Sequence, residues 1–163
     1  MHLIRSAHNV PVVIKLDINR AFYSVNWMVL RTMFENLHIP DKLIKIFFSG
    51  YQNAKIRVQH ADGIDNGFIL QHGVKKGGPE SPTVFSLFID PVIRKLGNLV
   101  AYADDVNLID MPENVKVRIQ QAKQLFGKIG LSVSESKTEI WNERTSHGSR
   151  EKRPYSKKIL KMN

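Results

Sequence analysis

Apolar and polar positions along the chain switch between strand-like and helix-like spacing. Residues 10–18 (VPVVIKLDI) form a mostly apolar, β-branched run that predicts a buried strand. Apolar side chains then recur three or four positions apart from Phe22 to Met33, which predicts a helix. Pro40 ends that region, and Asp41 is placed to cap a short helix over residues 42–49.

The middle of the chain predicts a pair of strands followed by a longer helix. Residues 55–59 and 68–71 are strand-like runs on either side of the turn-rich segment ADGIDNG. Ser81 is a suitable N-cap and Pro82 a suitable first helical residue, so we expect a helix from there to about residue 96. Pro91 should kink this helix.

The last third predicts a hairpin, a helix and a strand. Residues 99–110 contain two short apolar stretches joined by a tight turn at residues 103–105. An amphipathic helix over residues 115–129 should end at Gly130, and a strand over 138–142 follows the polar loop 132–137. This order predicts an α+β domain in which helices cover one face of an antiparallel sheet.

Length and composition set limits on the class of protein. The 163 residues, 42% of them hydrophobic, suffice for one domain with a buried core. No apolar run is long enough to span a bilayer, so we expect no membrane partner. The absence of cysteine excludes disulfides and thiolate metal sites and fits an intracellular protein.

The net charge of +9 suggests a polyanionic partner, most often nucleic acid. A basic surface with no particular partner is the alternative. Residues 143–163 carry seven basic and two acidic side chains, so +5 of the +9 lies there. We expect this segment to be a flexible tail that grips phosphates, or else the truncated edge of a larger domain.

Acidic residues occur next to apolar strand residues, at positions expected to be shielded from water. Asp17 ends the first apolar strand, and Asp104 and Asp105 occupy the hairpin tip. A carboxylate beside a core is costly unless it is paired or bound to metal, and Mg²⁺ prefers carboxylate oxygens. Two such ions about 4 Å apart can drive an in-line displacement. Taken singly, Asp17 could instead be an acid near a helix start, and the other two ordinary turn residues.

Four sequence segments, which follow one another in a fixed order, favour these aspartates as metal ligands over their interpretation as helix-start or turn residues. The segments are DINRAF at 17–22, GVKKGGPESP at 73–82, YADD at 102–105, and GL at 130–131 with KTE at 137–139. In this order they resemble the palm motifs A, B, C and D of reverse transcriptases, the closest likeness being to non-LTR retrotransposon and group II intron types.

The resemblance implies a polymerase palm with a ferredoxin- or RRM-like antiparallel sheet, and with fingers and thumb largely absent. Residues 1–142 would be the palm and 143–163 the tail. The likeness implies two Mg²⁺ ions, with Mn²⁺ as a possible substitute. Their ligands would be Asp17, Asp104, Asp105 and the carbonyl of Ile18.

The resemblance also implies a nucleotide pocket, formed by Arg20, Ala21, Phe22, Lys76 and Gly77. Phe22 would be the steric gate, whose ring clashes with a ribose 2′-hydroxyl and favours deoxynucleotides. Its alternative is a simple core position.

The family's motif D lysine corresponds to Lys137, which would protonate the leaving pyrophosphate. Four positions depart from the family pattern: Tyr23 replaces an acid, Lys76 a glutamine, Glu80 a leucine and Ser134 an asparagine. Lys76 only donates hydrogen bonds where glutamine also accepts them, and Glu80 adds an acid beside a triphosphate site.

The function implied by the resemblance is RNA-directed DNA synthesis for a retroelement. The chain would add deoxynucleoside triphosphates to a DNA primer on an RNA template, in a nuclear or cytoplasmic ribonucleoprotein if the host is eukaryotic. The alternative is a truncated relic that binds nucleic acid without catalysis. The sequence does not indicate an oligomeric state.

Overall fold

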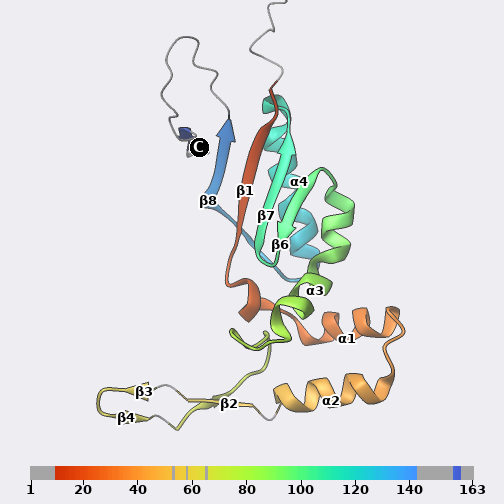
Figure 1. Ribbon diagram of the computed structural model, residues 1–163, viewed down its shortest axis with the longest axis vertical. Helices are drawn as coiled ribbons and strands as arrows, with labels where there is room; N and C mark the ends of the chain where they lie inside the picture. The colour runs from red at the N-terminus through yellow and green to blue at the C-terminus, as the bar shows by residue number, and fades with distance from the viewer. Residues whose placement is uncertain (1–9, 53, 58, 65, 143–155, 159–163) are drawn as a thin grey trace, which may run out of the picture. The chain divides into compact units, whose positions relative to one another are not determined.

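The computed structural model describes residues 10–52, 54–57, 59–64, 66–142 and 156–158 (Figure 1). The chain divides into two compact units. Residues 1–19 and 89–163 make up the first unit, and residues 20–88 make up the second. Helix α3 (Ser81–Leu96) belongs to both, since the division falls within it.

The first unit is built on an antiparallel sheet of five strands in the order β6-β7-β1-β8-β9. The strands are β1 (Val12–Ile18), β6 (Leu99–Tyr102), β7 (Asp105–Asp110), β8 (Val133–Asn142) and β9 (Ser156–Lys158). The order β8-β1-β7-β6 is that of a ferredoxin-like sheet. The predicted α+β class with an antiparallel sheet is therefore confirmed.

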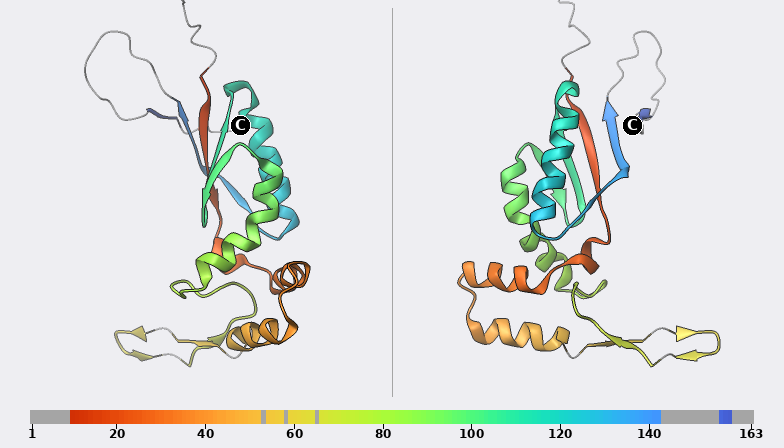
Figure 2. Two further views of the ribbon diagram at one scale, coloured as in Figure 1. Left: turned by 45° about the vertical axis from the view of Figure 1, so that its right-hand side comes forward. Right: turned by 180° about the vertical axis from the view of Figure 1, so that it is seen from behind.

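One face of this sheet is covered and the other is open. Along β1, buried side chains alternate with exposed ones, because successive residues of a strand point to opposite faces. The predicted strand is therefore confirmed, but it is half-buried rather than buried on both faces. Helix α4 (Val115–Lys128) and the second half of α3 lie on the same side of the sheet (Figure 2). The core between them includes Ile14, Leu16, Val106, Leu108, Val92, Ile119 and Phe126.

Helix α4 ends as the sequence predicts. Gly130 adopts a positive φ of 83°, a conformation that costs glycine little. The amide of Leu131 donates to the carbonyl of Phe126 at 3.0 Å, and Gly130 donates to Gly127 at 3.1 Å. These two bonds form a Schellman motif, which satisfies carbonyls that the helix end leaves without partners.

Strand β8 is longer than the sequence predicts, because residues 133–137 were expected in a loop. The backbone of β1 pairs with them, joining Ile18 to Val133 and Asp17 to Ser134. The register shifts between Lys15 and Asp17, and Thr138 Oγ1 donates to the carbonyl of Ser134 at 2.7 Å. Backbone pairing therefore outweighs the polar character of these side chains.

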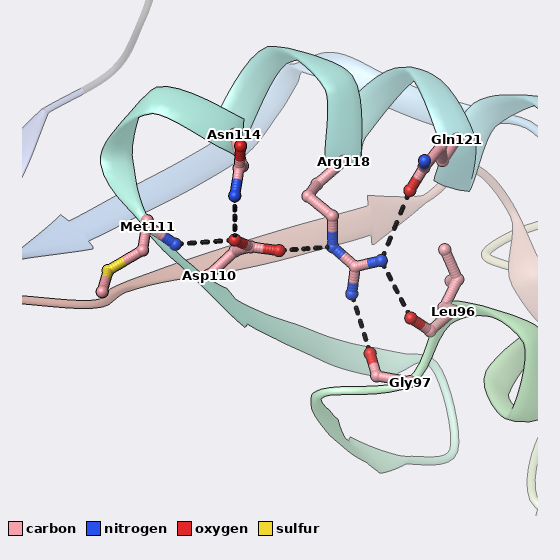
Figure 3. Close-up of polar contacts among 7 residues, drawn as sticks. All are labelled: Leu96, Gly97, Asp110, Met111, Asn114, Arg118 and Gln121. Atoms are coloured by element: carbon pink, nitrogen blue, oxygen red, sulfur yellow. Dashed lines mark hydrogen bonds and ion pairs between the residues drawn. The ribbon is translucent and has the colours of Figure 1, made fainter.

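A polar cluster joins the ends of three elements in the first unit (Figure 3). The Arg118 guanidinium on α4 donates to the carbonyls of Leu96 and Gly97, both at 2.8 Å. Its Nε lies 3.0 Å from Asp110 Oδ2 in an ion pair. Asp110 Oδ1 also accepts from Asn114 Nδ2 at 2.7 Å and from the Met111 amide at 2.8 Å. These bonds lower the pKa of Asp110, the one from Asn114 most and the Arg118 charge least.

The second unit contains two helices and a two-part hairpin. Its elements are η1 (Ala21–Ser24), α1 (Trp27–Asn36), α2 (Asp41–Gln52), β2 (Lys55–Ile56), β3 (Gln59–His60), β4 (Gly63–Ile64) and β5 (Phe68–Ile69). Strand β2 pairs with β5, and β3 pairs with β4. The predicted strands are present but shorter than expected. Aromatic rings fill the contact between α1 and α2, with Phe34 and Phe47 centroids 5.3 Å apart.

The sequence predicts one helix around residues 22–33, whereas the structure has two, η1 and α1. The side chain of Asn26 accepts hydrogen bonds from the amides of Met28 and Val29, at 2.9 and 3.2 Å. This N-cap starts α1 at Trp27 and separates it from the short helix η1.

The predicted basic tail, residues 143–163, lies outside the described residues except for β9, which pairs with β8. Within the described part of the chain, no helix is both long enough and apolar enough to cross a membrane.

Candidate active site

Two of the predicted metal ligands lie on neighbouring strands of the first unit. The register of β1 and β7 joins Leu16 to Val106, and both side chains are buried. The next position along each strand holds Asp17 on β1 and Asp105 on β7. Because side chains alternate between faces, both carboxylates lie on the open side of the sheet. Asp17 is partly exposed and Asp105 is exposed.

Asp104 lies at the tip of the β6–β7 hairpin. The last pair of the ladder joins Tyr102 to Asp105, which leaves Ala103 and Asp104 as the two turn residues. Ala103 has a φ of 50°, and two-residue hairpins need such a left-handed residue. This conformation costs alanine about 1 kcal/mol. The turn exposes Asp104 and the ring of Tyr102, which is 82% exposed.

Two lysines form ion pairs with these carboxylates. Lys15 Nζ lies 3.1 Å from Asp105 Oδ1, and Lys137 Nζ lies 3.8 Å from Asp17 Oδ2. All four side chains are substantially exposed, so each pair stabilises the fold by less than about 1 kcal/mol. The pairs place positive charge at carboxylates that would otherwise repel one another.

Lys15 is a residue that the motif comparison missed. It lies two positions before Asp17, which places it on the same face of β1. Strand alternation alone could have found it. The intervening positions of β1 hold apolar, buried side chains, so Lys15 lies on the opposite, exposed face.

The described residues contain no group of three or more acidic or histidine side chains arranged to hold a metal ion. The donor chemistry nevertheless fits Mg²⁺, because carboxylates are hard oxygen ligands. Asp17 and Asp105 contact ammonium groups here, and Ile18 is a buried residue of β1.

The predicted nucleotide-binding residues lie in the second unit. Ala21 is buried, and Arg20 is exposed with a φ of 47° at the start of η1. The ring of Phe22 is partly exposed and stacks on Phe85 of α3, with centroids 4.9 Å apart and an interplanar angle of 25°. Phe22 thus packs against a buried side chain and is also partly exposed, so the two interpretations of this residue are compatible.

The segment before α3 is joined to the segment around η1. The amide of Gly73 donates to the carbonyl of Val25 at 2.8 Å, and Val74 donates to Phe22 at 2.7 Å. Trp27 Nε1 donates to the carbonyl of Gly73 at 2.7 Å. A Cβ on Gly73 would lie 2.9 Å from backbone atoms of Tyr23, so the close approach requires glycine. The segments of motifs A and B are therefore in direct contact.

Lys76 and Gly77 are exposed in the loop that leads to α3. Gly77 has a φ of 91°, and a Cβ added there would meet no atom within 4 Å. The loop then enters α3, which begins at Ser81, one residue before the predicted first helical residue Pro82, and continues through Pro91 to Leu96 as expected.

Tyr51 is a second residue that sequence reasoning missed. Its hydroxyl donates to Glu80 Oε1 at 2.6 Å. This bond lowers the pKa of Glu80, and burial followed by the same bond raises the pKa of Tyr51. The partners lie far apart in the sequence, and Tyr51 belongs to none of the four motifs.

The predicted site residues thus form two groups, one in each unit. The first unit holds Asp17, Ile18, Asp104, Asp105 and Lys137, and the second holds Arg20, Ala21, Phe22, Lys76 and Gly77.

Fold and site together define a mixed α/β domain that carries carboxylates on adjacent antiparallel strands. A family model described as reverse transcriptase (RNA-dependent DNA polymerase) matches residues 1–157. The chain therefore belongs to the reverse transcriptase family.

Curated relatives identify the type of reverse transcriptase. The chain is 24% identical over 112 residues to the retrovirus-related Pol polyprotein from type-1 retrotransposable element R2 of Popillia japonica, covering 60% of the chain and 18% of the relative. It is 22% identical over 138 residues to the Pol polyprotein from type-2 element R2DM of Drosophila melanogaster, covering 77% and 13%. The resemblance to non-LTR retrotransposons is confirmed. The chain spans less than a fifth of the length of these relatives.

A solved structure supports the fold. Telomerase from Candida tropicalis, in complex with a fragment of telomeric RNA, matches with a TM-score of 0.62 at 18% identity. The match covers 80% of this chain and 26% of that chain.

Proposed function

We propose that this chain is the palm of an RNA-directed DNA polymerase of a retroelement. The observation that carries the proposal is the placement of Asp17 and Asp105 on the open face at the same end of adjacent strands, with Asp104 in the turn next to them. A family of RNA-dependent DNA polymerases supplies the reaction: attack of a primer 3′-hydroxyl on a deoxynucleoside triphosphate.

Asp17, Asp104, Asp105 and the Ile18 carbonyl would hold two divalent ions, Mg²⁺ or in its place Mn²⁺. When bound, the ions would supply charge neutralisation at the reacting phosphate and its two flanking oxygens. The carboxylates would bind and orient these ions. To do so, they would exchange their ion pairs with Lys15 and Lys137 for metal contacts.

The other site residues would act on the nucleotide. Phe22 stacks on Phe85, and the bulk of its own ring would exclude a 2′-hydroxyl. Lys137 carries a proton close to Asp17, where it can pass to the leaving pyrophosphate. Lys76 and Gly77 are exposed where phosphates can approach the backbone.

The proposed partners are an RNA template, a DNA primer and deoxynucleoside triphosphates. The net charge of +9 supports a polyanionic partner, and the telomerase match contains RNA. We place the chain in a nuclear or cytoplasmic ribonucleoprotein if its host is eukaryotic.

Paramagnetic Mn²⁺ tests the metal assignment without depending on activity. In the full chain, Mn²⁺ should broaden the backbone NMR signals of Asp17 and Asp104, and Asp105→Asn should remove this broadening. Asp41→Asn, on the exposed start of α2, is the matched control and should change nothing. Broadening that persists in Asp105→Asn would contradict the assignment.

Primer extension tests the activity itself. Supplied with fingers and thumb segments, the chain should extend a DNA primer on an RNA template with Mg²⁺, and Asp104→Asn should abolish the product. Extension that survives Asp104→Asn would show that the carboxylates do not carry the reaction.

A second candidate function is nucleic-acid binding without catalysis. The observation that favours it is the pairing of Asp105 with Lys15 and of Asp17 with Lys137, which occupies the carboxylates with protein cations. Binding of this kind would weaken steeply with salt and need no divalent ion. The Mn²⁺ experiment separates the two candidates, because only the polymerase requires metal at Asp17 and Asp105.

A further inference from the structure

The loop between β5 and α3 is fixed at both ends within the second unit. Its first end is joined to η1 and α1 through the hydrogen bonds of Gly73 and Val74. His72 adds a bond from its ring Nδ1 to the carbonyl of Tyr23 at 2.7 Å. At the second end the Gly78 amide donates to the carbonyl of Lys75 and the Ser81 amide donates to the carbonyl of Gly78, both at 3.2 Å, and side chains add a further attachment.

Tyr51 and Glu80 form the second attachment. Tyr51 belongs to the last turn of α2 and is only 3% exposed, and its ring packs 4.8 Å from Phe47. Its hydroxyl contacts Glu80 at 2.6 Å and lies 3.5 Å from Ser81 Oγ. A hydrogen bond to a carboxylate is stronger than a neutral one, so this contact links α2 to the start of α3.

Lys75 completes the arrangement from the loop itself. Its ammonium lies 5.2 Å from the centroid of the Tyr51 ring, and it donates to the carbonyl of Gly50 at 3.4 Å. The positive charge of Lys75 also contributes to the lowered pKa of Glu80.

Gly78 shows how closely the Glu80 carboxylate lies over the loop. A Cβ on Gly78 would lie 2.9 Å from Glu80 Oε2 and 2.9 Å from Ser81 Oγ. Lys76 and Gly77, by contrast, are exposed between the two attachments. The loop is thus held on either side of the two residues that the nucleotide would contact.

We infer that Tyr51 and Glu80 are positioning residues that hold Lys76 and Gly77 in place for the incoming nucleotide. The inference rests on the proposed function for the identity of the ligand. It also explains the departure at Glu80, because the carboxylate is bound by the Tyr51 hydroxyl and does not act as an isolated acid beside the triphosphate.

Amide hydrogen exchange in the full chain tests the positioning directly. Tyr51→Phe and Glu80→Leu should each raise the exchange rate of the Gly78 amide about fivefold or more, because this amide donates to the carbonyl of Lys75 and closes the turn that contains Lys76 and Gly77. Glu80→Gln retains an acceptor oxygen and should give an intermediate rate. The double variant Tyr51→Phe/Glu80→Leu should exchange no faster than either single variant. Glu113→Gln, at an exposed position in the first unit, is the control.

Nucleotide binding is the second measurement. It distinguishes a failure of the positioning inference from a failure of the proposed polymerase function. The dissociation constant for dATP should rise about fivefold in Tyr51→Phe and Glu80→Leu, and Glu80→Gln should restore part of the affinity. Faster loop exchange with no dATP binding by the unaltered chain would contradict the proposed function and leave the positioning intact. Exchange of the Gly78 amide that is as slow in Tyr51→Phe and Glu80→Leu as in Glu113→Gln would overturn the inference, whatever the affinity for dATP.

Discussion

At the scale of single residues, Phe22 has an observed role in packing and a proposed role in selectivity. Its ring stacks on Phe85, so truncation removes aromatic contact, and the same partly exposed side chain is the proposed barrier to ribose. A loss of stability alone would therefore not show that Phe22 acts on the substrate. The two effects need variants that separate them.

Phe22→Val should raise incorporation of ribonucleotides relative to deoxynucleotides about tenfold or more, because the smaller side chain leaves room for the 2′-hydroxyl. It should also lower the free energy of unfolding by about 1 to 3 kcal/mol through the lost contact with Phe85. Primer extension with paired nucleotides measures the first effect, and urea unfolding measures the second. Phe85→Leu is the matched control, and it should lose stability without a change in sugar selectivity. A selectivity change of equal size in Phe85→Leu would assign the effect to loosened packing.

At the scale of elements, local pattern predicts those structures whose determinants are close in sequence. The strand β1, the hairpin at Ala103 and Asp104, and the end of α4 at Gly130 were all predictable for this reason, although the alternating burial of β1 was not predicted. Strand β8 was not, because its polar first half is set by pairing with β1, more than a hundred residues away. The same holds for the break at Asn26, where a capping bond competes with an otherwise continuous helical pattern.

The residues of the candidate site also divide into those that the sequence predicts and those that depend on distant contacts. Asp17, Asp104, Asp105 and Lys137 could be predicted, because motif order carries them. Tyr51 could not, because its partner Glu80 is brought to it only by the packing of α2 and the start of α3.

The polar cluster around Arg118 gives a prediction at this scale. Asp110→Asn should lower the free energy of unfolding at pH 7 by about 2 kcal/mol, because the partly buried guanidinium loses its counter-charge. The pKa of Asp110 is lowered in the folded state, so its contribution is present above the unfolded pKa and is lost as the pH falls through the folded value. The difference between variant and parent should therefore shrink below about pH 4, the range in which a free aspartate takes up its proton.

Urea unfolding at pH 7 and at several lower pH values measures this dependence. Asp41→Asn, whose side chain is exposed and pairs with the exposed Lys45 one turn away on α2, should show no comparable effect. A stability difference for Asp110→Asn that stays constant from pH 7 to pH 3 would contradict an origin in the charge of Asp110.

At the scale of the whole molecule, the uneven charge distribution predicts how the chain binds nucleic acid. More than half of the net charge lies in residues 143–163, and affinity for a polyanion depends on how many counterions are released. Replacing Arg150, Lys152 and Arg153 by glutamine should weaken binding to an RNA–DNA duplex. It should also make the slope of log K against log salt shallower by about 2 to 3, if each side chain neutralises one phosphate.

The matched control removes the same kind of charge from an exposed helix, with Lys42→Gln and Lys45→Gln on α2. Filter binding or fluorescence anisotropy between 50 and 200 mM salt, the range over which such contacts change affinity most visibly, measures both variants. A shallower slope in the control alone would place the duplex on α2 instead of on the basic segment. Equal shifts in both would mean that net charge, and not its location, governs binding. Neither variant changes the carboxylates of Asp17 and Asp105, so Mn²⁺ broadening should be the same in both. This measurement therefore distinguishes binding of the duplex from binding of metal at the carboxylates.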